Sequence, residues 1–228
     1  MGLAGSTWEE VAATGGRRVL VIPFGSFEQH GPHLPLDTDT QIAVALADGL
    51  CRARPDVVRA PAVAYGASGE HAGFPGTLLV HHDVLAELVI ELVRSAREAF
   101  RGVVLLSAHG GNGEAMVRAE ALCRADGEAA LFWSPRTEGD AHAGRTETSL
   151  MLAIAPDSVR MALAAPGCTE PLQSILPRLR TEGVRPISSN GVLGDPTGAN
   201  ADEGRVLLDA LTRDLRDAVL ARWPEEPV

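Results

Sequence analysis

The sequence predicts an α/β fold, a three-layer α/β/α sandwich with a largely parallel central sheet. Short, continuous apolar runs end in Gly, Pro or small polar residues, which is typical of strands buried on both faces of a parallel sheet. Each run is followed by a loop and then by a segment whose apolar residues recur at helical spacing. With 228 residues and no linker-like tract, the chain is expected to form a single domain over residues 1–228.

The first half of the chain contains two strand–loop–helix units. Residues 18–23, which read RVLVIP, form the first expected strand, and apolar residues at helical spacing predict a helix over residues 40–54. Residues 57–65 form the second expected strand. The clearest helix covers residues 83–100, with apolar residues on one side, charged residues on the other and Asp83 as the expected N-cap.

The second half repeats this pattern. The expected elements are a strand at 102–107, a helix at 114–125, a strand at 129–133, a helix through 148–152 that ends near Pro156, and an amphipathic helix at 202–223. Residues 165–200 are rich in Pro and Gly without a clear period, so they are expected to be mostly loop.

The composition narrows the class of function. A formal net charge of −10 argues against a nucleic-acid-binding surface and against binding to an anionic membrane. No apolar run approaches the length of a membrane span. The three cysteines have no CxxC spacing, so a disulfide framework is not indicated. These features fit a soluble cytoplasmic enzyme with neither a nucleic-acid nor a membrane partner.

Three separated segments together supply His, Glu and Asp, the residue types that bind first-row metal ions. They are PFGSFEQHGPHLPLDTDT at 23–40, HGGN at 109–112 and HAGRTE at 142–147. A lone His or Asp in a loop is usually a solvated or turn-forming residue. Because each cluster follows an expected strand or opens an expected helix, together they favour one metal centre assembled by the fold. The sequence therefore predicts a metal-dependent hydrolase.

The spacing in the first two clusters suits a pair of ions. Glu28 and His30 are two residues apart, so on an extended segment both side chains point to the same side. Asp39 follows a turn bracketed by prolines and can bridge two cations with its two oxygens. His109 is followed by Gly110 and Gly111, which allow a tight backbone. Two divalent ions about 3.5–4 Å apart are a common hydrolytic arrangement.

Several motifs resemble the creatininase family of metal-dependent amidohydrolases. The resemblance rests on GSFEQHGPHLPLDTD at 25–39, HGGN at 109–112 and ETS at 147–149, and it extends over about residues 19–204. Three further stretches, at 64–71, 142–149 and 191–197, are similar to the peptidase branch of this family that acts on the mycofactocin precursor peptide.

The resemblance to this branch implies hydrolysis of a radical-modified precursor peptide, with release of a C-terminal Val-Tyr-derived dipeptide. It also implies a site with two divalent metal ions, zinc or ferrous iron, with manganese possible. Because relatives assemble as hexamers, a homohexamer is expected.

By position, the resemblance supplies ligands for two ions: Glu28, Asp39 and His109 for one, and His30 and Asp39 for the other. Creatinine-cleaving members have a glutamate two residues after the histidine that matches His109, where this chain has Gly111. The second ion is therefore short of one carboxylate. Glu147, in the first turn of its helix, is the expected replacement.

The catalytic candidates are His142 and Glu147. His142 matches the histidine proposed in the family to act on the scissile group or the leaving nitrogen. A histidine suits proton transfer because its ordinary pKa lies near neutrality. The alternative for His142 is a surface loop residue.

Four residues are expected to bind substrate: Glu70, His71, Trp133 and His33. Glu70 and His71 lie on a Gly-flanked loop, where a structural role is an equal alternative. Trp133 ends a strand and could instead belong to the core. His33 could orient a ligand or simply form a turn.

Two other functions remain open. One is a small-molecule amidohydrolase that opens a creatinine-type cyclic amide or hydrolyses a formamide, although Gly111 tells against creatinine itself. The other is a non-catalytic metal-binding partner in peptide maturation. That reading requires intact metal ligands without a competent proton shuttle at His142.

Overall fold

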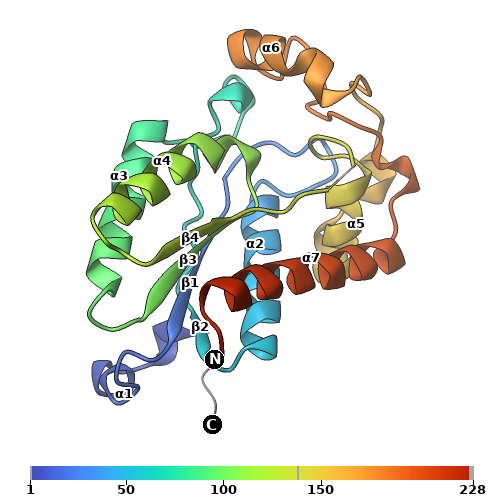
Figure 1. Ribbon diagram of the computed structural model, residues 1–228. Coiled ribbons are helices and arrows are strands. Elements are labelled where there is room, and N and C mark those ends of the chain that lie inside the picture. Colours follow the sequence, from blue (N-terminus) through green and yellow to red (C-terminus); the bar gives the residue numbers. More distant parts are fainter. Residues whose placement is uncertain (1, 138, 226–228) are drawn as a thin grey trace.

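Four parallel strands form the central sheet of the computed structural model, which describes residues 2–137 and 139–225 (Figure 1). They are β1 (Val19–Phe24), β2 (Val57–Arg59), β3 (Gly102–Ser107) and β4 (Ala130–Trp133), in the order β2-β1-β3-β4. Every residue of β1 and β3 is buried, as expected for central strands covered on both faces. The predicted parallel sheet is therefore confirmed. The expected domain, 1–228, extends beyond the described residues at both ends.

The register of β1 and β3 brings two loops together. The two strands pair from Val19 with Gly102 to Phe24 with Ser107, so they end at the same level. The amide of Ala108 continues this pairing by donating a hydrogen bond to the carbonyl of Phe24, at 3.1 Å. The loops that leave β1 and β3 therefore start side by side at the carboxyl edge of the sheet, where open α/β sheets place their sites.

Helices cover both faces of the sheet, as the three-layer prediction requires (Figure 1). Alternate strand residues point to opposite faces and build two separate cores. One face carries α2 (Thr38–Ala53), α5 (Arg145–Ile154) and α7 (Ala201–Arg222), and the other carries α3 (His82–Ala96) and α4 (Gly113–Ala125). Within the described chain, no helix is long and apolar enough to cross a membrane.

Three local expectations are corrected. The strand expected at 57–65 stops after β2, because Pro23 of β1, whose carbonyl faces this strand, has no N–H to donate to it; pairing resumes only at an isolated bridge between Val63 and Phe24. Helix α3 begins at His82 rather than after Asp83. Asp83 therefore lies in the first turn, where its charge favours the helix N-terminus without capping it.

The third correction concerns residues 165–200, which contain a helix as well as loops. Helix α6 (Leu172–Glu182) includes Pro177, a residue that interrupts most helices, so the local pattern indicates a loop. The helix is stabilised by tertiary contacts instead. Its small core is separate from the two main ones and consists of Ile175, Leu179, Val184 and Leu193. A short helix α1 (Trp8–Ala12) lies near the amino terminus.

Candidate metal centre

One side chain ties together the three loops that carry the site. Asn112 accepts a hydrogen bond from the amide of Ala67 at 2.9 Å. Its amide nitrogen donates to the carbonyl of Gly25 at 3.0 Å and to the Ser107 hydroxyl at 3.1 Å. These partners lie just after β1, at the end of β3 and in the loop after β2. Asn112 is fully buried, so the loops are held in one arrangement by satisfied hydrogen bonds.

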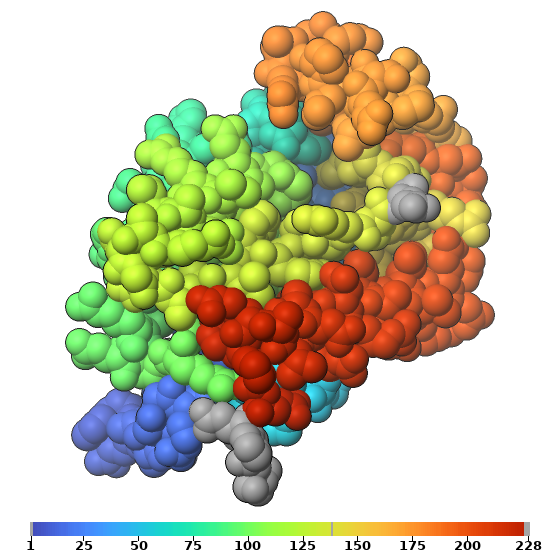
Figure 2. All heavy atoms as spheres, in the orientation of Figure 1, coloured from blue at the N-terminus to red at the C-terminus, as the bar shows by residue number. Residues whose placement is uncertain are grey.

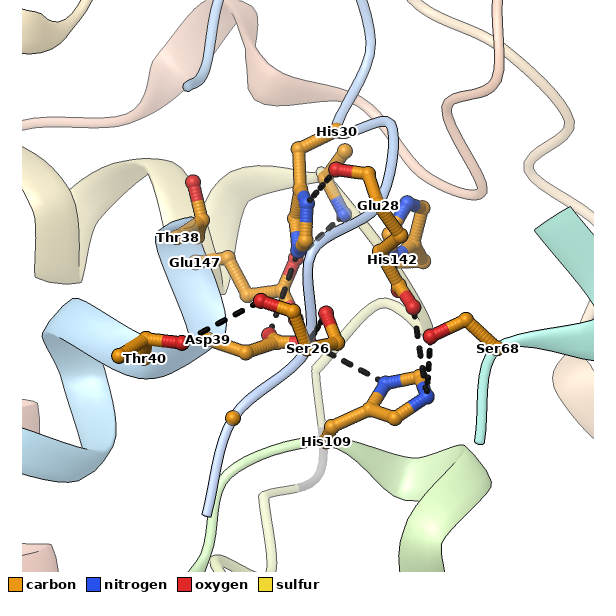
Figure 3. A network of polar contacts seen from close by, with 12 residues as sticks. Ser26, Glu28, His30, Thr38, Asp39, Thr40, Ser68, His109, His142 and Glu147 are labelled. Atoms are coloured by element: carbon orange, nitrogen blue, oxygen red, sulfur yellow. Dashed lines mark hydrogen bonds and ion pairs between the residues drawn. The ribbon is translucent and has the colours of Figure 1, made fainter. Parts of the chain in front are cut away.

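The predicted ligands converge at this edge of the sheet (Figure 3). We call the following five residues the ligand cluster: Glu28, His30, Asp39, His109 and Glu147. Among the described residues, three groups have ligand atoms within 4.8 Å of one another: Glu28–Asp39–His109, His30–Asp39–Glu147 and Glu28–His30–His142. The first two share Asp39, so the geometry offers two adjoining triads.

Asp39 has the arrangement expected of a bridging carboxylate. Its Oδ1 lies 3.2 Å from Nε2 of His30, and its Oδ2 lies 3.1 Å from Nδ1 of His109. The Ser26 hydroxyl donates a hydrogen bond to Oδ2 at 2.7 Å and helps to orient the group. Burial would raise the pKa of Asp39, but the charges of the two histidines outweigh it and hold that pKa well below its usual range. The carboxylate therefore stays ionised.

Nearby carboxylates raise the pKa of both histidines in the cluster. Burial alone would lower the pKa of His30, but the charge of Asp39 outweighs it and the pKa rises to about 10. The pKa of His109 also rises to about 10, because Glu28 and Asp39 outweigh the effect of burial. His30 places Nδ1 3.1 Å from the carbonyl of Glu28, which leaves Nε2 directed at Asp39.

The surroundings of the Glu28 carboxylate indicate whether the ligand cluster can bind a cation. Its side chain is fully buried, and neither carboxylate oxygen accepts a hydrogen bond from a described residue. The nearest nitrogens are Nε2 of His71 at 3.2 Å and Nε2 of His109 at 3.3 Å. Burial raises the pKa of Glu28 to about 7. Because a buried carboxylate without hydrogen bonds is costly, this position fits a positively charged ion, and the mixed N/O donor set suits a divalent first-row metal.

Glu147 lies where the sequence expected a replacement carboxylate. Its Oε2 accepts a hydrogen bond from the amide of Ala143 at 2.6 Å and lies 4.0 Å from Nε2 of His30. Burial raises the pKa of Glu147 to about 7. At Gly111, in contrast, an added Cβ would collide with the carbonyl of Ala67 and with the His109 ring. This loop therefore cannot accommodate a glutamate at position 111 without moving.

His142 lies beside the ligand cluster rather than on the surface. Its Nε2 is 2.8 Å from the carbonyl of Gln29, which identifies Nε2 as the donor and leaves Nδ1 with a free electron pair, 3.8 Å from Glu28 Oε1. Its ring centroid is 4.4 Å from those of His30 and His71. Burial, followed by the nearby histidines, lowers the pKa of His142 well below its usual value. The ring is therefore neutral at pH 7.

A cavity of about 770 Å³ opens over the cluster. Glu70 and His71, two of the expected substrate-binding residues, line it together with Glu28, Asp39 and His142. Burial, and then the charge of His109, lower the pKa of His71 to about 3, so its ring is also neutral. The cavity thus contacts both the candidate ligands and the candidate proton shuttle.

Two expected substrate-binding residues lie elsewhere. Trp133 is buried in the core on the α2 side of the sheet, and its Nε1 donates to Asp214 at 2.8 Å. His33 is fully buried, with Nε2 2.9 Å from the Thr148 hydroxyl. Neither is among the described residues that line the cavity. The structure therefore does not bring these two residues to the cavity, because loop and strand-end positions identify neither the direction of a side chain nor what packs on it.

Gln29 is a residue that the sequence argument missed. Its Nε2 lies 2.9 Å from Nδ1 of His71, 3.1 Å from Nε2 of His142 and 3.0 Å from the carbonyl of Gly191. Because Nε2 of His142 is itself the donor to the main-chain carbonyl of Gln29, Gln29 positions His71 with its side-chain amide and His142 with its carbonyl. The sequence offered one signal for Gln29, its place between two candidate ligands. On an extended segment, alternate side chains point to opposite sides, so Gln29 is expected to face away from Glu28 and His30.

The chain matches the creatininase family model, described as creatinine amidohydrolase, over residues 4–219. It belongs to the creatininase family. The mycofactocin precursor peptide peptidase of Mycobacterium tuberculosis is 47% identical over 219 residues, covering 91% of this chain and 86% of that protein. The same-named protein of Mycolicibacterium smegmatis is 46% identical over 212 residues, covering 90% and 85%.

Solved structures agree with this family assignment. One described as "Creatininase Mn" is 25% identical, covers 98% of both chains and superimposes with a TM-score of 0.83. The predicted creatininase-like α/β fold is thereby confirmed. This chain is a member of a family of metal-dependent hydrolases of C–N amide bonds, and it carries clusters of His, Glu and Asp that could hold metal ions.

Proposed function

We propose that this chain is a metal-dependent peptidase that hydrolyses a mycofactocin precursor peptide. The substrate is a radical-modified precursor, and the product is its C-terminal Val-Tyr-derived dipeptide. Identities of 47% and 46% to mycobacterial proteins named for this activity support the proposal. The observation that carries the chemistry is Asp39, whose two oxygens face His30 and His109 at 3.2 and 3.1 Å.

The proposed cofactor is a pair of divalent ions, zinc or ferrous iron, with manganese as the alternative. Glu28, Asp39 and His109 would hold one ion, and His30, Asp39 and Glu147 the other. Bound divalent ions supply Lewis acidity, which polarises an amide carbonyl and lowers the pKa of water. The unbonded oxygens of Glu28 support this assignment, since a metal ion would satisfy them.

His142 is the proposed proton carrier of the reaction. Its neutral ring presents Nδ1 to the cavity while Nε2 is engaged by Gln29. A neutral imidazole accepts the proton released by the attacking water and returns it to the leaving nitrogen. The main-chain carbonyl of Gln29 accepts the hydrogen bond from Nε2 and holds the ring in this orientation.

The proposal is tested by assaying metal-stripped and reconstituted protein with a synthetic crosslinked precursor peptide, using mass spectrometry. Stripped protein should be inactive, and adding zinc, ferrous iron or manganese should restore release of the dipeptide. Creatinine and a formamide are assayed in parallel. Hydrolysis of either small amide without peptide cleavage would favour the small-molecule alternative. Peptide cleavage that survives complete removal of metal would contradict the mechanism.

We further propose a cytoplasmic homohexamer. The net charge of −10 and the absence of a candidate membrane span from the described helices fit this location. Family membership supports the closed oligomer, with α7 and the 165–200 segment as expected contacts. Light scattering of purified protein should give six times the 23.9 kDa chain mass, and a monomer would refute the assembly.

A further inference from the structure

Helix α6 projects from the body of the molecule, on the side of the sheet edge where the ligand cluster lies (Figure 1). In the space-filling view, the surface is hollowed beneath the orange spheres of this segment (Figure 2). Three leucines at helical spacing, Leu172, Leu176 and Leu179, line the cavity that contains Glu28 and Asp39. These leucines give α6 an apolar face toward the cavity, whereas Arg180, Thr181 and Glu182, at the end of the helix, add polar and charged groups to the lining.

The first two leucines are exposed rather than used to anchor the helix. Leu172 is 45% exposed and Leu176 is 36% exposed. Ile175 and Leu179, which are 1% and 8% exposed, instead hold α6 against its small core. The fold thus divides the apolar residues of α6 into a pair that stabilises the helix and a pair left available inside the cavity.

The opposite wall of the same cavity is polar. It includes Glu28, Asp39, His109, His142 and Glu147. A ligand that fills this space meets charged and hydrogen-bonding groups on one side and leucine side chains on the other. A volume of about 770 Å³ is within the usual range for pockets that enclose a ligand far larger than a simple cyclic amide.

We propose that Leu172 and Leu176 bind an aliphatic or aromatic side chain next to the scissile amide of the substrate, while the ligand cluster receives the amide itself. This inference rests on the proposed peptidase function and identifies the residues that read the peptide. Burying these exposed leucines against a substrate side chain removes apolar surface from water, which favours binding. The cavity lining therefore favours a substrate in which a large apolar side chain lies next to the scissile amide.

The test compares wild-type protein with Leu172→Ser, Leu176→Ser and the double variant, all loaded with zinc. Substrates are a peptide with Val and Tyr beside the cleavage site and a matched peptide with Gly and Ser there. Each substitution should raise KM for the apolar peptide about tenfold, leave kcat nearly unchanged and leave the polar peptide unaffected. Leu122→Ser on α4 is the control, because Leu122 is 44% exposed but does not belong to the cavity lining.

Each result has a defined meaning. Unchanged KM values in the variants, beside an active wild type, would overturn the role of the α6 leucines while leaving the peptidase function standing. A lower oligomer mass on light scattering, with KM unchanged, would assign this face to contact with a second copy and would likewise overturn it. Failure of wild-type protein to cleave any peptide would refute the proposed function itself. Binding of the Val-Tyr dipeptide, followed by calorimetry, should weaken in parallel with the KM effect.

Discussion

The ligand cluster and helix α6 face the same cavity but are built differently. The cluster lies on segments that leave β1 and β3 and on the first turns of α2 and α5, and buried hydrogen bonds from Asn112 and Ser26 hold these segments. Helix α6 rests on a small separate core and leaves apolar side chains exposed. The part of the molecule proposed for chemistry is therefore structurally separate from the part proposed for substrate selection. Changes in the cluster should affect kcat and metal content, whereas changes in α6 should affect KM.

The largest expected effect comes from Asp39→Asn. An amide replaces one of the two facing oxygens with an NH₂ group that cannot bind a metal ion, so the two triads lose their shared ligand. The value of kcat/KM should fall by at least ~10³-fold, and the metal content should drop by one ion or more per chain. Peptide assays and elemental analysis measure these effects. Asp37→Asn is the control, since the Asp37 carboxylate accepts a hydrogen bond from Gln41 and is not among the described residues that line the cavity. Full activity of the Asp39 variant would remove the bridge from the mechanism.

His142→Ala should lower kcat by roughly 10²–10⁴-fold with metal content retained, because the ring is proposed to carry a proton and not to hold an ion. Steady-state kinetics and elemental analysis of the same preparation separate these roles. Since His142 also lies within reach of Glu28 and His30, loss of metal in this variant would identify it as a ligand instead. His81→Ala, at an exposed position before α3, is the matched control. Unchanged turnover would remove His142 from the mechanism.

Gly111→Ala tests how tightly the cluster is packed. The new Cβ would collide with the Ala67 carbonyl and lie 2.6 Å from Oε1 of Glu70, so the loop must shift. We expect a loss of about 1–3 kcal/mol in the free energy of unfolding, measured by thermal or denaturant unfolding. Gly110→Ala provides the comparison, because a Cβ there has no described heavy atom within 4 Å. Equal stability of the two variants would show that the loop around Gly111 can shift without a loss of stability.

The affinity of the cluster for metal should rise with pH. Metal ions compete with protons for their ligands, and burial raises the pKa of both Glu28 and Glu147 to about 7. In metal-free protein the pKa of Glu28 is raised from 4.5 to about 7, so protonation of Glu28 favours the folded state. The free energy of unfolding should therefore decrease as the pH rises from 4.5 through about 7. Zinc binding measured by competition with a chelator should be at least ~10-fold tighter at pH 8 than at pH 6. A Glu28→Gln variant should bind more weakly and with less pH dependence; an unchanged pH profile would exclude Glu28 as a ligand.

The smallest effect is expected for Trp133→Phe, which tests whether this residue belongs to either wall of the cavity. The substitution removes the hydrogen bond to Asp214 and should destabilise the protein by about 1–2 kcal/mol. Values of kcat and KM should be unchanged, because Trp133 lies in the core on the α2 side of the sheet. Chemical denaturation beside peptide kinetics provides the check. A large increase in KM would instead support the sequence-based expectation that it covers substrate.

The candidate ligands could be predicted from sequence because they lie within short segments whose places in the fold are set by strong local signals. A buried parallel strand places the next loop at its carboxyl edge, so Glu28, His30 and His109 had to lie at one end of the sheet. Gln29, Trp133 and His33 show the limit of that argument. The direction and partners of each of these side chains depend on segments far away in sequence, such as Gly191, Asp214 and Thr148.

The sequence by itself determined the parallel α/β architecture, the order of its main strands and helices, and the residues available to hold metal ions, since apolar periodicity and strand-end loops are local properties. Tertiary structure alone decided that Gln29 contacts His71, that Trp133 packs in the core, and that a proline-containing segment becomes α6 above the cavity. These outcomes depend on contacts between residues distant along the chain, and the pattern of a single segment does not predict such contacts.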